Sequence, residues 1–195
     1  MVRSAEVDVR QCTRCPDLCA SRTQIVNSVG TLDAELVFVG EAPGEQEDRQ
    51  GEPFVGRSGE ILTAALRDRG LSRQDVRIVN SIRCRPPDNR NPTSAELANC
   101  RPYLERELRT INPQLLVTLG KVPSEHLLDR DVAVTAEAGS VQEATIGGSV
   151  FQILVCIHPA ATLYDPSQRD RFMSTLDRAI DLTSPNSGQA NLDEF

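Results

Sequence analysis

Six cysteines occur in the sequence, and four of them are spaced like the ligands of a metal centre. These four form two pairs, Cys12 with Cys15 and Cys84 with Cys100. Without signs of secretion, a Cys-x2-Cys pair indicates metal binding more than a disulfide. Four thiolates bind either a structural zinc ion or an iron-sulfur cluster, and the spacing leaves both open. Cys19 is an alternative ligand, because C-x2-C-x3-C is also a cluster triplet, whereas Cys156 lies in an apolar run and is expected to be buried.

Polar side chains stand at the ends of three predicted strands. The acidic stretch EAPGEQED (41–48) directly follows the apolar run ELVFVG (35–40). Asn80 ends a second apolar run, and His158 follows a third. Ligands of open α/β sheets bind where the strands end, so these positions predict a binding site. A solvated acidic turn with no function is the alternative reading of 41–48.

Strands and amphipathic helices alternate along the chain. Strands are expected at 35–40, 76–80, 114–120 and 151–156, the last as one arm of a hairpin over 140–156 that breaks at Gly147-Gly148. Helices are expected at 58–70, from Thr93, at 124–128 and at 167–181. Thr93 and Glu96 match the capping-box pattern that opens a helix. This alternation predicts an α/β fold, a three-layer α/β/α arrangement with a central, largely parallel four-stranded sheet.

The bulk composition indicates one globular domain, which we expect to be a monomer. The 195 residues are assigned to a single domain over 1–182 and a flexible polar tail over 183–195. No apolar stretch reaches the length of a membrane span, and the N-terminus lacks the apolar core of a signal peptide, so a cytoplasmic protein is expected. The net charge of -7 argues against broad electrostatic attraction to nucleic acid. The arginines of 83–90 leave a local phosphate-facing patch open, and solvated surface arginines are the alternative.

Three longer motifs, together with the cysteine pairs, resemble one known family. The motifs are GEAPGEQEDRQGEPFVGRSGEIL (40–62), VNSIRCRPPDNRNPTSAEL (79–97) and HPAATL (158–163). They resemble the family 4 uracil-DNA glycosylases, and the resemblance runs from Cys12 to about Phe172. It implies a [4Fe-4S] cluster on Cys12, Cys15, Cys84 and Cys100, and hydrolysis of the N-glycosidic bond of deoxyuridine in DNA, which leaves an abasic site.

The resemblance assigns roles around an extruded uracil base. Phe54 is expected to stack on the ring, in a pocket that also includes Gly40 and Ala42. The Asn80 amide offers a donor and an acceptor that match the O4 and N3–H edge of uracil and mismatch cytosine. His158 is expected to face uracil O2, where negative charge develops as the base departs. The structural alternatives are a core phenylalanine, an asparagine that caps its own turn and a structural His-Pro.

The acidic stretch lacks a familiar catalytic acid. Family 1 enzymes have a Gln-Asp pair where this chain has Glu41-Ala42, and Ala42 cannot position water. Glu41 and Glu47 are therefore the candidates for positioning water or supporting the oxocarbenium-like sugar, with Asp48 behind them. Because a dissociative mechanism depends mainly on electrostatic support, loss of the aspartate weakens activity without preventing it.

Other residues are expected to contact DNA or a protein partner. Leu163 is the candidate wedge that fills the space of the flipped base, or else it packs its loop on the last helix. Phosphates are expected to meet Arg83, Arg85 and Arg90. The terminal QANLDEF resembles the peptide that docks repair enzymes on the sliding clamp, through Gln189, Leu192 and Phe195.

A non-turnover iron-sulfur protein that binds uracil DNA or recognises damage remains an alternative. Such relatives carry a basic, histidine-containing insertion after the Phe54 loop. Here 56–59 runs directly into the helix, which favours turnover. A non-catalytic zinc or cluster module that recruits repair factors is the second alternative.

Overall fold

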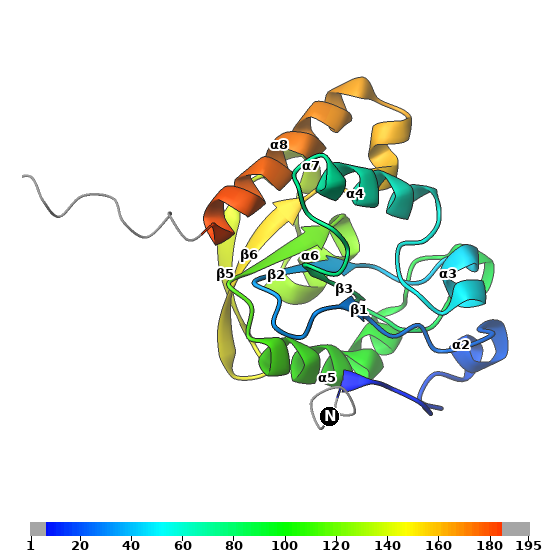
Figure 1. The fold of residues 1–195 in the computed structure, drawn as a ribbon. Helices are drawn as coiled ribbons and strands as arrows, with labels where there is room; N and C mark the ends of the chain where they lie inside the picture. The colour runs from blue at the N-terminus through cyan, green and yellow to red at the C-terminus, as the bar shows by residue number, and fades with distance from the viewer. Residues whose placement is uncertain (1–6, 185–195) are drawn as a thin grey trace, which may run out of the picture.

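The computed structural model describes residues 7–184, which form a six-stranded mixed sheet (Figure 1). The strand order is β1-β3-β2-β4-β6-β5. The four inner strands β3, β2, β4 and β6 are parallel, and β1 and β5 pair antiparallel at the two edges. The predicted parallel core is therefore confirmed, but the predicted count of four strands was too low. The strands are β1 Val29–Gly30, β2 Leu36–Gly40, β3 Arg77–Asn80, β4 Leu115–Leu119, β5 Val141–Ile146 and β6 Ser149–Cys156.

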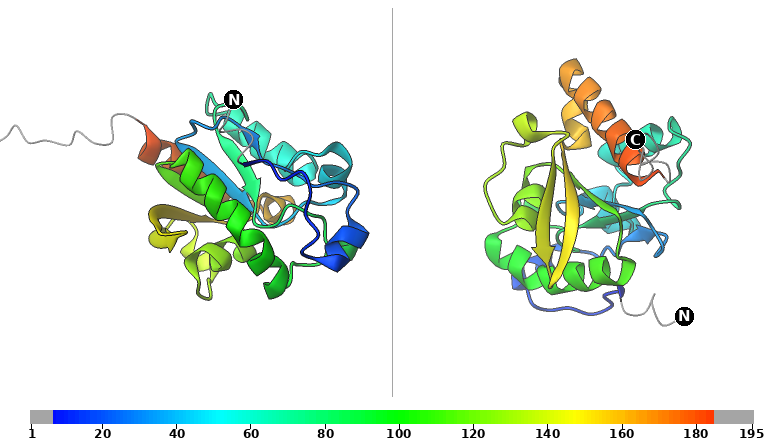
Figure 2. Two further views of the ribbon diagram at one scale, coloured as in Figure 1. Left: turned by 90° about the horizontal axis from the view of Figure 1, so that it is seen from below. Right: turned by 90° about the vertical axis from the view of Figure 1, so that its left-hand side faces the viewer.

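Helices cover both faces of the sheet, which gives the predicted three layers (Figures 1 and 2). Alternate strand residues point to opposite faces: Phe38 joins the core beneath α4 and α8, and Val39 joins the core beneath α5 and α6. Both residues are fully buried, as expected for a parallel sheet covered on both sides. The helices are α2 Pro16–Ser21, α3 Glu45–Gln50, α4 Arg57–Arg67, α5 Ser94–Ile111, α6 Lys121–Leu128, α7 Val134–Glu137 and α8 Pro166–Thr183, with 3-10 turns η1 Pro87–Asn89 and η2 Pro159–Leu163.

Local signals in the sequence place several boundaries correctly. Thr93 caps α5 reciprocally: its hydroxyl accepts from Glu96 N at 3.2 Å, and its own N–H donates to Glu96 Oε2 at 2.7 Å. The β5–β6 hairpin turns at Gly147 and Gly148, whose φ angles of 56° and 84° are readily adopted only by glycine. These features depend on neighbours in sequence, which explains why they can be predicted.

The acidic stretch 41–48 is not simply a turn, because its second half forms helix α3. Gly44 is the N-cap, and its N–H donates to the Glu47 carboxylate at 3.1 Å. Gly51 ends the helix in the left-handed conformation with φ 80°. Helix α3 lies beside α2 (Figure 1), and Asp48 joins them by accepting the Thr23 N–H at 2.9 Å. The N-terminal segment is thereby attached to the edge of the sheet where the strands end.

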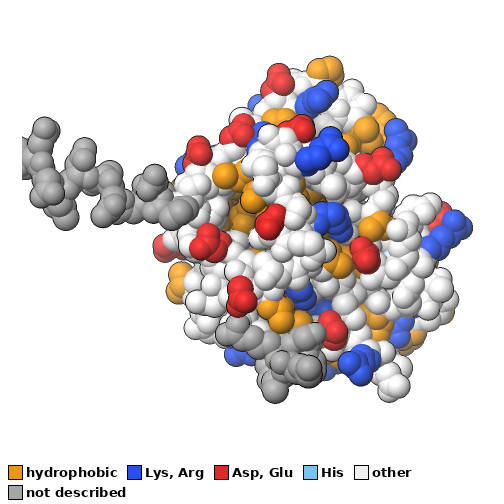
Figure 3. Space-filling model, viewed as in Figure 1, with side chains coloured by type: hydrophobic (Ala, Val, Ile, Leu, Met, Phe, Trp, Pro, Cys, Tyr) orange, Lys and Arg blue, Asp and Glu red, His pale blue; other side chains and the backbone are white. Residues whose placement is uncertain are grey.

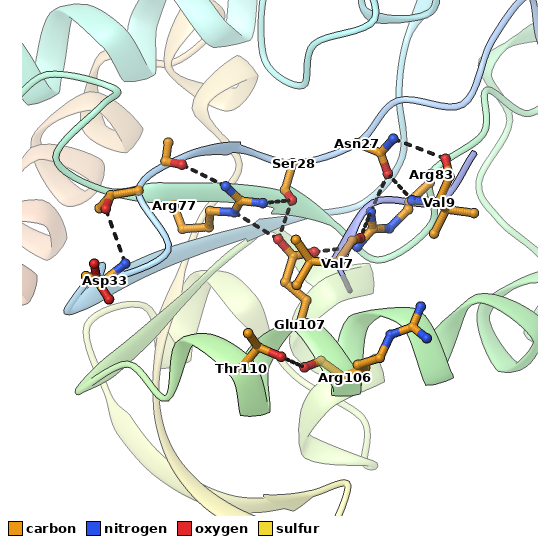
Figure 4. A network of polar contacts seen from close by, with 12 residues as sticks. Val7, Val9, Asn27, Ser28, Asp33, Arg77, Arg83, Arg106, Glu107 and Thr110 are labelled. Atoms are coloured by element: carbon orange, nitrogen blue, oxygen red, sulfur yellow. Dashed lines mark hydrogen bonds and ion pairs between the residues drawn. The ribbon is translucent and has the colours of Figure 1, made fainter. Parts of the chain in front are cut away.

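A buried ion-pair network joins α5 to the sheet and to the N-terminal segment (Figure 4). Glu107 on α5 is fully buried and pairs with Arg77 of β3 at 2.9 Å and with Arg83. Arg83 also donates to Val7 O at 2.9 Å and to Asn27 Oδ1 at 2.5 Å. The prediction that Arg83 contacts phosphates was wrong, because the residue is 2% exposed and its guanidinium is engaged inside the fold.

The surface of the described chain carries both signs of charge. On the face seen in Figure 3, acidic and basic side chains are interspersed. Among residues 7–184, no helix has the length and apolar character needed to cross a bilayer.

Candidate active site

The ends of the parallel strands surround a cavity of about 190 Å³. This volume is below the roughly 300–1,000 Å³ of pockets for drug-sized ligands, so a single small ring is the appropriate occupant. Six predicted site residues line it, together with Gly44 and Ser58, which were not among the predicted site residues. The lining residues are Glu41, Ala42, Gly44, Glu47, Phe54, Ser58, Asn80 and His158. The convergence predicted from three strand ends is therefore present in the fold.

Asn80 presents an unpartnered hydrogen-bond acceptor at this cavity. It ends β3, is 5% exposed, and its Oδ1 is buried without a hydrogen-bond partner in the described structure. An unsatisfied buried polar atom costs about 1–3 kcal/mol, which is consistent with an acceptor reserved for a ligand. Gly40 keeps the approach open, because a Cβ there would lie 2.4 Å from Asn80 Oδ1 and 2.4 Å from the Phe54 ring. Gly40 thus shapes the pocket by its lack of a side chain.

His158 is held as a neutral donor that faces the cavity. Its Nδ1 accepts the Ala160 N–H at 3.2 Å, which leaves the proton of the neutral imidazole on Nε2. Burial lowers the pKa of His158 below its usual value, and the negative charge of Glu47 only partly opposes this. At neutral pH the side chain is therefore an uncharged imidazole with one N–H available to a ligand.

Phe54 forms a wall of the cavity in a strained loop. Its φ of 54° lies in the left-handed region, which non-glycine residues rarely adopt. The loop is fixed by Arg73, whose guanidinium donates to Phe54 O at 2.8 Å and to Pro53 O at 2.6 Å. Gly59 allows the close approach of this loop, since a Cβ there would lie 1.9 Å from Phe54 O. The centroids of the Phe54 and His158 rings are 6.1 Å apart, and both rings belong to residues that line the cavity.

The two candidate carboxylates have different surroundings. Glu47 is buried and accepts three backbone N–H groups, from Gly44 at 3.1 Å, Val55 at 3.0 Å and Gly56 at 2.9 Å. Glu41 is half-buried, and desolvation raises its pKa. Within the described chain no hydrogen bond or ion pair engages the Glu41 carboxylate, so it is the one available to a ligand.

The four paired cysteines line a second, separate cavity. Leu18 and Ile82 also form its wall, and Cys19 does not: its Sγ lies 3.5 Å from Cys12 O. Among residues 7–184, no three His, Cys, Asp or Glu side chains converge closely enough to hold a single metal ion. The lining cysteines are Cys12, Cys15, Cys84 and Cys100.

The predicted contacts of Arg85, Arg90 and the clamp peptide are not tested by the structure. Arg85 is half-buried and donates to Asn89 Oδ1 at 2.8 Å, and Arg90 forms a bidentate pair with Glu96 at 2.8 and 2.7 Å. Both arginines remain partly accessible, and their contact with phosphates stays a prediction. The predicted clamp peptide, Gln189, Leu192 and Phe195, lies outside the described residues and also stays a prediction.

Two exposed large side chains lie on the segment that follows His158. Leu163 ends η2 and is 40% exposed, and Tyr164 follows it at 84%. Tyr164 was missed in the sequence reasoning, although an aromatic residue directly after the wedge candidate was a usable signal. Both lie within six residues of His158 in the sequence, and neither is among the residues that line the cavity.

A larger cavity of about 470 Å³ lies between α5 and α6. It is lined by Arg101, Glu125 and His126 among others and contains no strand-end residue. Among the cavities lined by residues 7–184, the smaller one is the candidate active site, because an unpartnered acceptor, a neutral donor and an aromatic wall meet there.

Sequence comparisons identify the class of protein that has this architecture and this strand-end site. A family model described as the uracil DNA glycosylase superfamily matches residues 28–180. This match covers more than half of the 195-residue chain, so the chain belongs to that superfamily.

Within the superfamily, several similar relatives are type-4 enzymes. The Type-4 uracil-DNA glycosylase of Archaeoglobus fulgidus is 42% identical over 171 residues, which cover 86% of this chain and 85% of that protein. The Thermotoga maritima protein of the same description is 42% identical, over 84% of this chain and 83% of its own length. The Saccharolobus solfataricus protein is 38% identical, over 83% and 77%. The chain is therefore a member of the type-4 family, as its motifs indicate.

Proposed function

We propose that this protein is a monofunctional uracil-DNA glycosylase, which hydrolyses the N-glycosidic bond of deoxyuridine in DNA and leaves an abasic site for base excision repair. The observation that carries the proposal is the unpartnered Oδ1 of Asn80 in the strand-end cavity. Uracil supplies the missing donor at N3–H, and its O4 accepts from the Asn80 amide nitrogen. Cytosine offers an acceptor at N3 and a donor at N4, so a fixed amide orientation rejects it.

His158 is proposed to stabilise the departing base. Its Nε2–H is positioned as a neutral donor by the Ala160 N–H, which binds Nδ1. Negative charge develops on uracil O2 as the glycosidic bond breaks, so a hydrogen bond there strengthens in the transition state. The lowered pKa fits this role, since it keeps the donor from carrying a charge that the buried site would have to desolvate.

The carboxylates are proposed to divide two tasks. Glu41, whose carboxylate is unengaged, supports the oxocarbenium-like sugar and orients the attacking water. Glu47 acts as a positioning residue, because its three backbone hydrogen bonds join the Gly44 turn to the loop that carries Phe54. Ala42 lines the cavity without a polar group, so the familiar aspartate has no replacement at that position.

The function is tested with end-labelled oligonucleotides that contain one uracil, in single- and double-stranded form. After incubation with the protein and then hot alkali, we expect strand cleavage at the uracil position only. Matched oligonucleotides with thymine or cytosine should stay intact. Cleavage at uracil that does not exceed background would refute the proposal, and cleavage before alkali treatment would refute monofunctional chemistry.

Replacing His158 by alanine is expected to lower kcat by about 100-fold or more, the usual loss when one donor to a developing oxyanion is removed. KM should change little, because the bond is stronger in the transition state than in the ground state. Single-turnover release of uracil measures the effect, and His158→Gln tests whether another donor restores part of it. An unchanged single-turnover rate in His158→Ala would contradict the assignment.

Leu163 and Tyr164 are proposed to enter the duplex beside the flipped base. We expect Leu163→Ala to reduce activity on double-stranded DNA on the order of tenfold, because filling the vacated stack offsets a few kcal/mol of unstacking. Activity on single-stranded DNA should be preserved, since no duplex must be opened. Exposed Val150, on β6, provides a matched control as Val150→Ala. Equal losses on both substrates would exclude a wedge role.

The four-cysteine cavity is proposed to hold a [4Fe-4S] cluster. Four cysteine thiols that line one cavity support a four-thiolate centre, and the motifs that resemble family 4 enzymes favour an iron-sulfur cluster over zinc. Because glycosidic hydrolysis needs no redox step, the cluster would serve to join the N-terminal segment to the loop after β3. Anaerobically purified protein should contain iron and sulfide and absorb at about 400 nm, and Cys12→Ser should lose the iron, the sulfide and this absorbance. Stoichiometric zinc without iron would overturn the assignment, whereas Cys156→Ser should leave the cluster intact.

A further inference from the structure

Arg22 connects the two segments that carry the cysteine pairs. It follows α2 as its C-cap residue, and its Nη1 lies 2.9 Å from the Sγ of Cys84. Its Nη2 donates to the backbone oxygen of Cys12 at 2.6 Å. One planar guanidinium therefore contacts a sulfur from the loop after β3 and the backbone of a cysteine in the N-terminal segment.

Other polar groups near the cysteines do not make the same contact. Asn99 Nδ2 lies 3.5 Å from Cys15 Sγ, which is a longer and uncharged contact. The guanidinium of Arg14 lies over the Tyr103 ring at 4.7 Å and donates to Asn99 O. Among the hydrogen bonds within residues 7–184, Arg22 thus provides the charged donor to a cysteine sulfur.

The backbone around Arg22 is held in place by hydrogen bonds to α2 and α3. Its N–H donates to Leu18 O at 2.9 Å, and the next residue, Thr23, donates to both oxygens of the Asp48 carboxylate at 2.9 Å. Gln24 also binds α3, through Asp48 O and Arg49 O at 3.0 Å. The guanidinium therefore projects from an anchored turn, which reduces the entropy lost when it binds sulfur.

A charged donor at a ligating thiolate has two chemical consequences. A charge-assisted hydrogen bond stabilises the thiolate and orients it, and removal of such outer partners typically costs about 10- to 100-fold in metal affinity or activity. Hydrogen bonds and positive charge at the sulfurs also stabilise the more negative, reduced state of an iron-sulfur cluster and raise its reduction potential.

We propose that Arg22 is a positioning residue of the cysteine site, which holds Cys84 as a ligand against the N-terminal segment, slows loss of the bound cluster and raises its reduction potential. The inference rests on the proposed cluster and is independent of the glycosylase reaction. Arg22 does not line the uracil cavity, so its effect is read on the cluster itself.

The test compares Arg22→Gln, Arg22→Lys and the control Arg10→Gln, which removes an exposed arginine from the same N-terminal segment. Iron release to a ferrous chelator is followed by the loss of absorbance, and the reduction potential is measured by voltammetry. We expect Arg22→Gln to release iron at least about tenfold faster and to shift the potential to more negative values. Arg22→Lys should have a release rate and a reduction potential between those of Arg22→Gln and the wild type. Arg10→Gln should match the wild type in both.

The possible outcomes distinguish the role of Arg22 from the cluster proposal and from the glycosylase proposal. Wild-type release and potential in Arg22→Gln would overturn the role of Arg22 while the cluster proposal stands. A wild-type protein without iron and sulfide would overturn both. If Arg22→Gln does not fold, Arg22→Lys decides the matter: it keeps the charge but lacks the planar fork, so unchanged release and potential overturn the inference. Uracil release by the wild type tests the proposed enzyme separately.

Discussion

Replacing Asn80 by alanine is expected to lower kcat/KM for uracil in DNA by about 100- to 1,000-fold, comparable to the loss of a preorganised donor in other active sites. The amide is the group in the cavity whose acceptor has no partner inside the described fold. Truncation removes the hydrogen bonds to the N3–H and O4 edge, so the base is neither held nor distinguished from cytosine. Steady-state kinetics on a single-stranded uracil oligonucleotide measures the effect without the contribution of duplex opening.

The same variant should fold normally, which separates a substrate contact from a structural residue. Because Asn80 Oδ1 bonds to nothing in the described structure, its removal breaks no internal hydrogen bond at that atom. We expect the thermal midpoint and the iron content to match those of the wild type and of the exposed control Asn91→Ala. A destabilised or colourless Asn80→Ala protein, or one with full activity, would contradict the assignment.

Replacing Glu107 by alanine is expected to reduce the free energy of unfolding by about 3–5 kcal/mol, the typical result when one partner of a buried ion pair is removed. Its carboxylate is fully buried and serves two arginines, Arg77 and Arg83, which would remain charged without a counter-ion. Urea unfolding followed by circular dichroism measures the change. If Glu107→Ala is too unstable to purify, Glu107→Gln keeps the shape and should show a smaller loss in the same direction.

A surface ion pair provides the contrast for that measurement. Glu45 pairs with Arg49 on α3, and both side chains are about half exposed, at 46% and 64%. Glu45→Ala is expected to cost less than about 0.5 kcal/mol, because solvent screens exposed pairs. Equal effects of Glu45→Ala and Glu107→Ala would show that the buried network does not carry the stability assigned to it.

The Glu107 network also reduces the number of predicted arginines that are available to contact DNA phosphates. Arg83 precedes the ligand candidate Cys84 and orients the start of the cysteine loop from inside the fold. Only Arg85 and Arg90, of the three arginines predicted to meet phosphates, are accessible enough to do so. The electrostatic contribution to DNA binding, and hence its salt dependence, is therefore expected to be modest for a chain of net charge -7.

Local patterns in the sequence determined the parallel strands at the centre of the sheet and the residues that line the strand-end cavity. Apolar runs of strand length, the Thr93 capping box and the Gly147-Gly148 turn depend on neighbouring residues, and each appears where it was predicted. The strand-end rule then placed Glu41, Asn80 and His158 at one edge of the sheet, and they line one cavity. The short elements that were not predicted, among them β1, α2, α3 and α7, have few residues and therefore a weak periodic signal.

Only the tertiary structure decided which of the chemically similar residues are available to a ligand. Arg83 looks like Arg85 in sequence, but it is buried by Val7, which lies 76 positions away, and by Glu107 on a different element. Glu47 looks like Glu41, but three backbone N–H groups from two loops occupy its carboxylate. These differences arise from contacts between segments that are distant in sequence. Spacing along the chain determines which groups can reach an edge of the sheet, while packing between distant segments determines which of them remain unpaired there.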